Sequence, residues 1–163
     1  MAVARSRRAF LGGEPEPPRG LAPPWAAAEF ATACTGCGDC IAACPEGILK
    51  LGAHGRVEVD VRQGAGACTF CAVCAERCPE PAFDLGRQRP WDVTARIGAG
   101  CLAHGGVHCQ SCGDACPEQA IRFSLRLGGP PVPSLDPLAC SGCGACVGVC
   151  PAAAITLGQT GHG

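Results

Sequence analysis

The chain has 163 residues and a formal net charge of −1, so neither a basic surface for nucleic acid nor a strongly acidic docking surface is indicated. It has no stretch approaching the ~20 consecutive apolar residues of a membrane-spanning helix. Aromatic residues make up only 4% of the chain, whereas it contains 24 Gly, 15 Pro and 16 Cys. Small domains with so little bulky material are usually held together by disulfides or metals.

Residues 1–29 form a proline-rich N-terminal arm that begins with the basic and apolar stretch RSRRAFLGG. Paired arginines open the signal peptides of the twin-arginine export pathway. Such a signal also needs an apolar region of about 7–15 residues, and here acidic residues and prolines follow the arginines instead. We therefore expect a cytoplasmic protein, in a compartment where reducing conditions keep thiols free.

Four cysteine runs follow the arm. The first, second and fourth have the spacing C-x2-C-x2-C-x3-C-P, the bacterial ferredoxin motif for [4Fe–4S] clusters. The third run keeps the last two gaps and the proline, but seven residues separate its first two cysteines. In chain order, the runs are Cys34, Cys37, Cys40 and Cys44; Cys68, Cys71, Cys74 and Cys78; Cys101, Cys109, Cys112 and Cys116; and Cys140, Cys143, Cys146 and Cys150.

The segments between the runs predict short strands. Residues 48–51 and 56–61 flank a glycine-containing turn and predict a hairpin. Residues 82–85, 120–125 and 154–157 occupy the same place after the other three runs. With one-turn helices near the last cysteines, this pattern predicts a small α+β, bacterial ferredoxin-like fold whose core is its iron–sulfur clusters.

The spacing within the runs suits a cubane cluster. Three thiolates can come from one tight loop, and the small residues between them let the backbone wrap closely around the sulfurs. In two-cluster ferredoxins the fourth cysteine, which precedes proline, ligates the neighbouring cluster. Four runs therefore predict four [4Fe–4S] clusters, with all sixteen cysteines as iron ligands.

Three alternatives compete with this interpretation of the cysteines. A disulfide framework needs an oxidising compartment, and cysteines this dense rarely reach the geometry of a bridge. Zinc sites use two C-x2-C pairs, and neither the third cysteine of each run nor the C-P dipeptide is needed at such a site. The ligands of the third run are left undecided. Cys101 is either the fourth ligand or a bystander. If it is a bystander, the cluster has three irons or His108 is a ligand.

The distances between runs suggest how they pair. Cys44 to Cys68 and Cys116 to Cys140 each enclose 23 residues, whereas residues 79–100 between the second and third runs resemble a linker. We expect two pseudo-symmetric two-cluster units, residues 30–88 and 92–158, each exchanging its fourth cysteine. The alternative nests the runs, first with fourth and second with third. The expected sets are set I (Cys34, Cys37, Cys40, Cys78), set II (Cys44, Cys68, Cys71, Cys74), set III (Cys101, Cys109, Cys112, Cys150) and set IV (Cys116, Cys140, Cys143, Cys146).

Several further stretches carry a resemblance to a known family. The SRRAFLGG start, the Pro-Pro-Trp at residues 23–25, the segment RPWDVTARIGAGCLA at residues 89–103 and the stretched third run occur together. In this combination the chain resembles NapF, a family of ferredoxin-type accessory proteins of the periplasmic nitrate reductase system.

The resemblance implies a cytoplasmic protein that meets the precursor of the catalytic subunit, NapA, before export. Its expected task is maturation of NapA, by loading its cluster or by maintaining its redox state. We expect Arg7, Arg8, Phe10 and Leu11 to bind this partner. No nucleophile or paired carboxylates indicate an enzyme. The alternative function is a general polyferredoxin that carries electrons between redox proteins, or an electron-transfer subunit of an oxidoreductase.

Overall fold

A computed structural model describes residues 20–159, which fold into short helices and two-stranded sheets. None of the helices in this part of the chain is long and apolar enough to cross a membrane. The helices are α1 (Phe30–Ala33), α2 (Asp39–Ala43), α3 (Val73–Glu76), α4 (Ser111–Asp114) and α5 (Ala145–Gly148). The strands are β1 (Leu49–Leu51), β2 (Val57–Val59), β3 (Val93–Ile97), β4 (Ile121–Arg126), β5 (Gly129–Leu135) and β6 (Ile155–Gln159).

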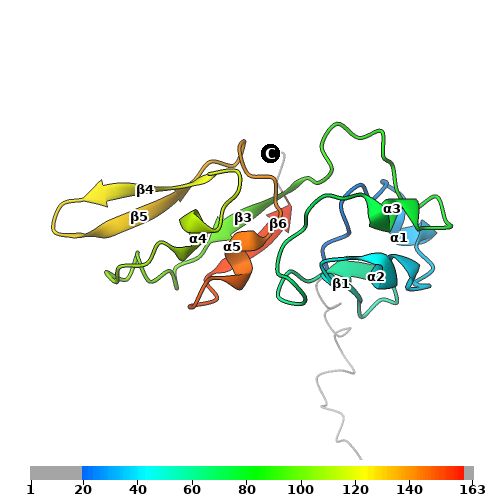
Figure 1. Cartoon of the computed structure of the whole chain (residues 1–163), viewed down its shortest axis with the longest axis horizontal. Coiled ribbons are helices and arrows are strands. Elements are labelled where there is room, and N and C mark those ends of the chain that lie inside the picture. The colour runs from blue at the N-terminus through cyan, green and yellow to red at the C-terminus, as the bar shows by residue number, and fades with distance from the viewer. Residues whose placement is uncertain (1–19, 160–163) are drawn as a thin grey trace, which may run out of the picture.

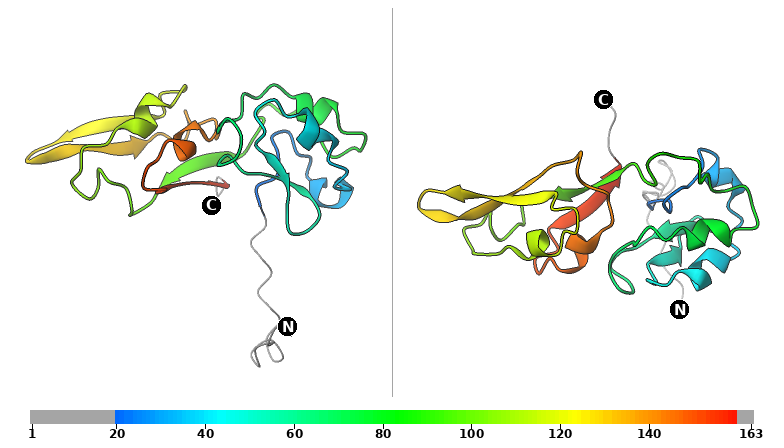
Figure 2. Two further views of the ribbon diagram at one scale, coloured as in Figure 1. Left: turned by 60° about the horizontal axis from the view of Figure 1, so that its bottom comes forward. Right: turned by 45° about the horizontal axis from the view of Figure 1, so that its top comes forward.

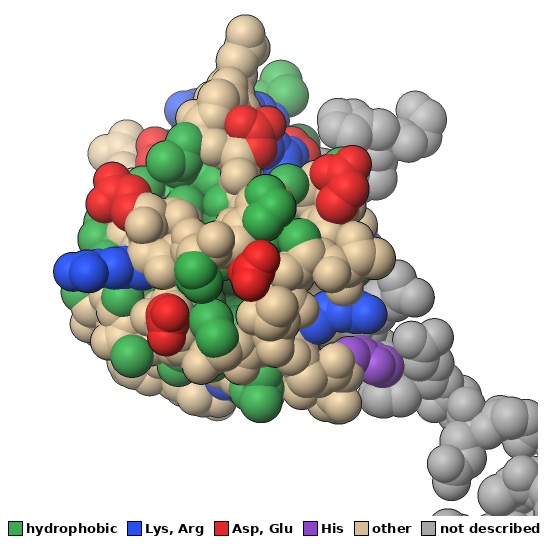
Figure 3. Space-filling view, turned by 90° about the vertical axis from the view of Figure 1, so that its right-hand side faces the viewer, with side chains coloured by type: hydrophobic (Ala, Val, Ile, Leu, Met, Phe, Trp, Pro, Cys, Tyr) green, Lys and Arg blue, Asp and Glu red, His purple; other side chains and the backbone are tan. Residues whose placement is uncertain are grey.

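The molecule is elongated, with an N-terminal half (residues 20–88) beside a C-terminal half (residues 92–159). Figures 1 and 2 show the two halves next to each other along the long axis, and the β4–β5 hairpin projects from the far end of the C-terminal half. Figure 3 views the N-terminal half end-on, where positive and negative side chains are interspersed with hydrophobic ones.

All three sheets are antiparallel pairs. β1 and β2 form the predicted hairpin, with Leu49 opposite Val59 and Leu51 opposite Val57. In the C-terminal half, β3 pairs with β6 and β4 pairs with β5. The strands expected at residues 120–125 and 154–157 are therefore confirmed as β4 and β6, whereas the sequence did not indicate β3 and β5.

The prediction of a strand at residues 82–85 is wrong. Phe83 makes only an isolated bridge to Ala26, supported by the Asp84 N–H, which donates to the Trp25 carbonyl at 2.8 Å. Prolines stand close to this contact on both chain segments, at positions 23, 24 and 81, and they cannot donate ladder hydrogen bonds. The pairing that extends over five residues in β3–β6 is reduced here to one bridge.

The core runs through both halves and contains cysteines. Ile48, Val57, Ile121 and Ile155 are among its buried aliphatic residues. Four cysteines are buried with them, namely Cys40, Cys112, Cys140 and Cys146. The first, third and fourth cysteine runs therefore contribute side chains to the core.

The segment between the halves is fixed by packing. Trp91 is buried, and its Nε1–H donates to the Ala22 carbonyl at 2.9 Å. Arg87 pairs with Asp92 and donates to the Ala26 carbonyl at 2.7 Å. The residues expected to form a linker thus pack against the start of the described chain.

The two halves meet beside two of the cysteine loops. The Cys68 N–H donates to the Cys143 carbonyl at 2.8 Å, and Val61 packs so closely on Gly144 that a Cβ there would lie 2.6 Å from the valine side chain. Arg62 adds a hydrogen bond from Nη2 to the Ile155 carbonyl at 3.4 Å. These contacts join the second and fourth runs across the junction.

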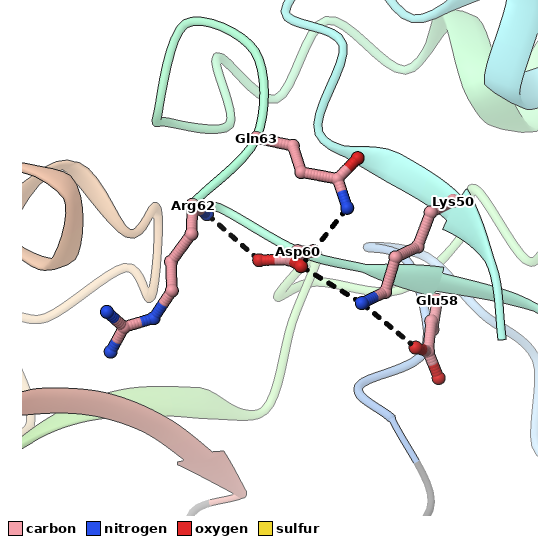
Figure 4. Close-up of polar contacts among 5 residues, drawn as sticks. All are labelled: Lys50, Glu58, Asp60, Arg62 and Gln63. Atoms are coloured by element: carbon pink, nitrogen blue, oxygen red, sulfur yellow. Dashed lines mark hydrogen bonds and ion pairs between the residues drawn. The ribbon is translucent and has the colours of Figure 1, made fainter. Parts of the chain in front are cut away.

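A small polar network orders the chain just before this junction. Figure 4 shows that Asp60 accepts hydrogen bonds from Lys50 Nζ at 2.9 Å, the Arg62 N–H at 3.0 Å and Gln63 Nε2 at 3.2 Å. Lys50 also pairs with Glu58 at 3.5 Å. The hydrogen bond from Lys50 is the main cause that lowers the pKa of the Asp60 carboxyl, so this aspartate stays ionised and keeps the turn after β2 in place.

Candidate cluster sites

Three cavities in the structure are each lined by four cysteines. In each cavity, three cysteines come from one run and the fourth comes from the other run of the same half. Their cysteines are those of set II, set III and set IV. In set I, the electrostatic neighbours of Cys40 are Cys78, Cys34 and Cys37. The structure thus groups the cysteines as in two-cluster ferredoxins, and their role as ligands stays a prediction.

Residues in a left-handed backbone conformation curve the cysteine loops. In the first and fourth runs, glycines at positions 36, 38, 142 and 144 adopt φ between 70° and 91°, a left-handed conformation that costs glycine little. The helices α2, α3, α4 and α5 each carry the third cysteine of a run and direct the chain toward the fourth. The sequence therefore places three sulfurs on one loop and sends the last one to the neighbouring set.

The donor chemistry of these sites fits a [4Fe–4S] cluster. Such a cluster takes four thiolates around a compact core, and each set offers four thiols. Backbone N–H groups already point at sulfurs, from Phe70 to Cys68 Sγ at 3.4 Å and from Ala154 to Cys150 Sγ at 3.3 Å. Such bonds stabilise negative charge on the sulfurs and tune a bound cluster.

The stretched third run still brings its first cysteine to the cavity of set III. Cys101 lines this cavity together with Cys109, Cys112 and Cys150. The inserted residues form a compact turn, in which the Gly105 N–H donates to the Cys101 carbonyl at 3.0 Å. His108 is not among the described residues that line the cavity.

Burial and crowding raise the pKa values of several thiols. Burial is the largest cause in each case, and neighbouring cysteines add to it. The pKa rises to about 11 for Cys40 and Cys68 and to about 12 for Cys74 and Cys146. Without a bound cation these thiols are protonated at neutral pH, so loading iron must displace protons.

A pH dependence of iron binding follows from these values. A raised thiol pKa means that protons compete with iron more strongly as the pH falls, so the loaded chain should lose iron faster at pH 6 than at pH 8. We expect this in anaerobic incubations with a chelator whose own affinity is corrected for pH, followed by the loss of visible absorbance. Equal rates across this range would contradict proton competition at the cysteines.

Three residues near set II have backbone conformations that sequence reasoning missed. Trp25, Phe70 and Ala72 have φ of 59°, 54° and 62°, although none is glycine. The only sequence signal is that Phe70 and Ala72 stand where the first and fourth runs have glycine. Arg7, Arg8, Phe10 and Leu11, expected to bind a partner, lie outside the described residues.

Comparisons with known proteins agree with a cluster-binding chain. A 4Fe-4S dicluster domain family matches residues 33–82 and 107–154, a range that includes every cysteine except Cys101. The ferredoxin-type protein NapF of Escherichia coli (strain K12) is 42% identical over 159 residues, covering 96% of each chain. The ferredoxin-type protein NapF of Haemophilus influenzae is 43% identical over 140 residues, covering 85% of this chain and 78% of that protein.

Proposed function

Since the chain belongs to the NapF family of ferredoxin-type proteins, we propose that it is a cytoplasmic accessory protein that assists maturation of the periplasmic nitrate reductase subunit NapA before export. It would supply a cluster to the precursor or keep the precursor in the right redox state. The observation that carries this proposal is the identity of 42% over 96% of both chains. The similarity thereby extends beyond the two dicluster domains to the segments outside them.

In this proposal sets I to IV hold four [4Fe–4S] clusters. A bound cluster supplies one-electron chemistry and is also a unit that can pass to another protein. The chain's own part is to hold each set of four thiols in place and to shield it with the surrounding apolar residues. Set IV, with Cys140 and Cys146 buried, is the most enclosed set.

Cluster transfer to NapA tests the proposal. The full-length chain is loaded anaerobically with isotopically labelled iron and mixed with apo-NapA precursor, and the proteins are then separated. We expect labelled iron on NapA even when a chelator in the buffer removes free iron. The matched control is the same chain loaded with unlabelled iron beside free labelled iron, which should leave NapA unlabelled. If NapA gains no iron from the loaded chain and its redox state is also unchanged, the proposal fails.

The alternative, an electron carrier, is favoured by one observation. Electrostatic contacts join Cys40 to Cys74, Cys68 to Cys143 and Cys146 to Cys112. The four sets therefore lie in the series I, II, IV, III along the molecule. A continuous series suits electron transport between two redox proteins. Electron exchange with such proteins, with neither iron transfer to NapA nor a change in its redox state, would support this function.

The N-terminal arm supplies a second test. Replacing Arg7 and Arg8 together by alanine should weaken binding to NapA precursor roughly tenfold or more, because each hydrogen bond to a charged group contributes about 1.5–3 kcal/mol. Binding is measured by biolayer interferometry on the full-length loaded chain.

The matched control for the arm replaces Arg122 and Arg126 of β4 by alanine, which removes the same charge from another part of the chain. That variant should bind like the wild type. Unchanged affinity of the arm variant would show that the arginines of the arm do not bind NapA.

A further inference from the structure

The loop of set II is built on an unfavourable backbone. Phe70 and Ala72, on either side of Cys71, have φ of 54° and 62°. In the first run the equivalent positions are Gly36 and Gly38, which adopt this region without a side-chain penalty. The left-handed conformation is unfavourable for a residue with a Cβ, so set II stores strain on both sides of Cys71.

Set II also differs from the other three sets in the exposure of its cysteines. Cys71 is exposed, and none of the four cysteines of set II is buried. Set IV is the opposite case, because two of its cysteines are buried and none is exposed. Set I also has an exposed cysteine, Cys37, but its Cys40 is buried and its loop carries glycines at the strained positions.

An aromatic pair lies beside set II. Trp25 lines the cavity of set II and meets Phe70 edge-to-face, with ring centroids 6.2 Å apart and an interplanar angle of 81°. Trp25 has a left-handed backbone as well, and its N–H donates to the Pro90 carbonyl at 2.6 Å. Two aromatic rings on strained backbone thus pack against each other beside the set that has no buried cysteine.

We propose that set II is the exchange site, from which the chain gives up a cluster, and that Trp25 and Phe70 are positioning residues that control its release. This inference rests on the proposed maturation function and names the donor site within it. The acceptor is a protein that offers four free thiols. Transfer to the acceptor requires access to the sulfurs, and set II combines access at Cys71 with strain that relaxes when the loop is freed.

The exchange balances without an oxidant or a reductant. The bonds from iron to the thiolates of set II break, and the same number of bonds form to the acceptor's thiols. The acceptor's thiols lose their protons as these bonds form, and the freed thiolates of set II take up the same number. No electron is gained or lost by either protein.

The test is the order in which the thiols become reactive. The full-length loaded chain is incubated anaerobically with a chelator and an alkylating reagent, and modified cysteines are identified over time by mass spectrometry. We expect Cys71, the exposed cysteine of set II, to be alkylated before the cysteines of the other three sets. If a cysteine of set I, set III or set IV reacts first, set II is not the exchange site.

Two variants separate strain from access at set II. Ala72→Gly removes strain and keeps every ligand, so alkylation of set II should slow roughly fivefold. Trp25→Ala removes the aromatic cover and should accelerate it, and Trp25→Phe, which restores a ring, should return the rate toward that of wild type. Unchanged alkylation rates in both Ala72→Gly and Trp25→Ala would overturn the roles of strain and cover.

Gly38→Ala is the matched control at the equivalent position of the first run. Gly38 has φ of 91°, and a Cβ added there would meet no atom within 4 Å, so alanine adds strain without a clash. Alkylation of set I should accelerate while that of set II is unchanged. This test uses a chelator in place of NapA. Early release from set II can therefore be observed even if transfer to NapA fails, so failure of this inference is distinguishable from failure of the proposed function.

Discussion

Replacing Cys101 by serine should remove the cluster of set III or convert it to a three-iron form. Cys101 lines the cavity of set III with the other three cysteines, so its loss leaves one iron without a thiolate. We expect the iron content per chain to fall and a new electron paramagnetic resonance signal to appear in the oxidised protein. The remaining three sets should keep their spectra.

Val107→Ser is the matched control for this change. Val107 is exposed in the same inserted loop and does not line the cavity, so the variant should keep its full iron content. If Cys101→Ser also keeps the iron content and spectrum of the wild type, Cys101 is a bystander and set III has another fourth ligand.

Replacing Gly142 by alanine should have a large effect although it leaves all cysteines in place. Gly142 has φ of 78°, and an added Cβ would overlap the carbonyl oxygen of Val93 in β3. Since that atom belongs to the backbone, either the loop of set IV or β3 must move. We expect a loss of roughly 2–4 kcal/mol in the free energy of unfolding, together with loss of iron from set IV.

Gly128→Ala isolates the conformational part of this effect. Gly128 has φ of 71° in the turn between β4 and β5, where a Cβ would meet no atom within 4 Å. Thermal unfolding of the loaded chains should therefore show a shift for Gly128→Ala that corresponds to only ~1 kcal/mol. Equal shifts for the two variants would mean that the contact with Val93 does not constrain set IV.

The cysteine spacing predicted much of the fold and the candidate sites, because ligand geometry is encoded in local gaps. The β1–β2 hairpin was also predictable, since its two strands and its glycine-containing turn are contiguous. β3 was not predictable, because its partner β6 begins nearly sixty residues later in the chain and no local pattern indicates the pairing. β5 contains prolines at 130, 131 and 133, which argue against a central strand but are tolerated in a sheet of only two strands.

The features around set II could not be predicted from the sequence for a different reason. Phe70 and Ala72 are ordinary residues in the sequence, and only the backbone reveals their left-handed conformation. The hydrogen bond between Cys68 and Cys143 joins residues far apart in the chain, so the series of the four sets could not be derived from spacing. Long-range packing determines both the left-handed backbone at set II and the order of the four sets, and local sequence propensity does not encode it.

The most direct test of a four-cluster protein is anaerobic purification of the full-length chain, followed by counting iron and acid-labile sulfide and by Mössbauer spectroscopy. We predict equal amounts of iron and sulfide, corresponding to four [4Fe–4S] clusters per chain, with a single class of cubane signals in the oxidised protein. Iron without sulfide, bound zinc, or cysteines paired as disulfides in the native protein would contradict the assignment of the sixteen cysteines as cluster ligands.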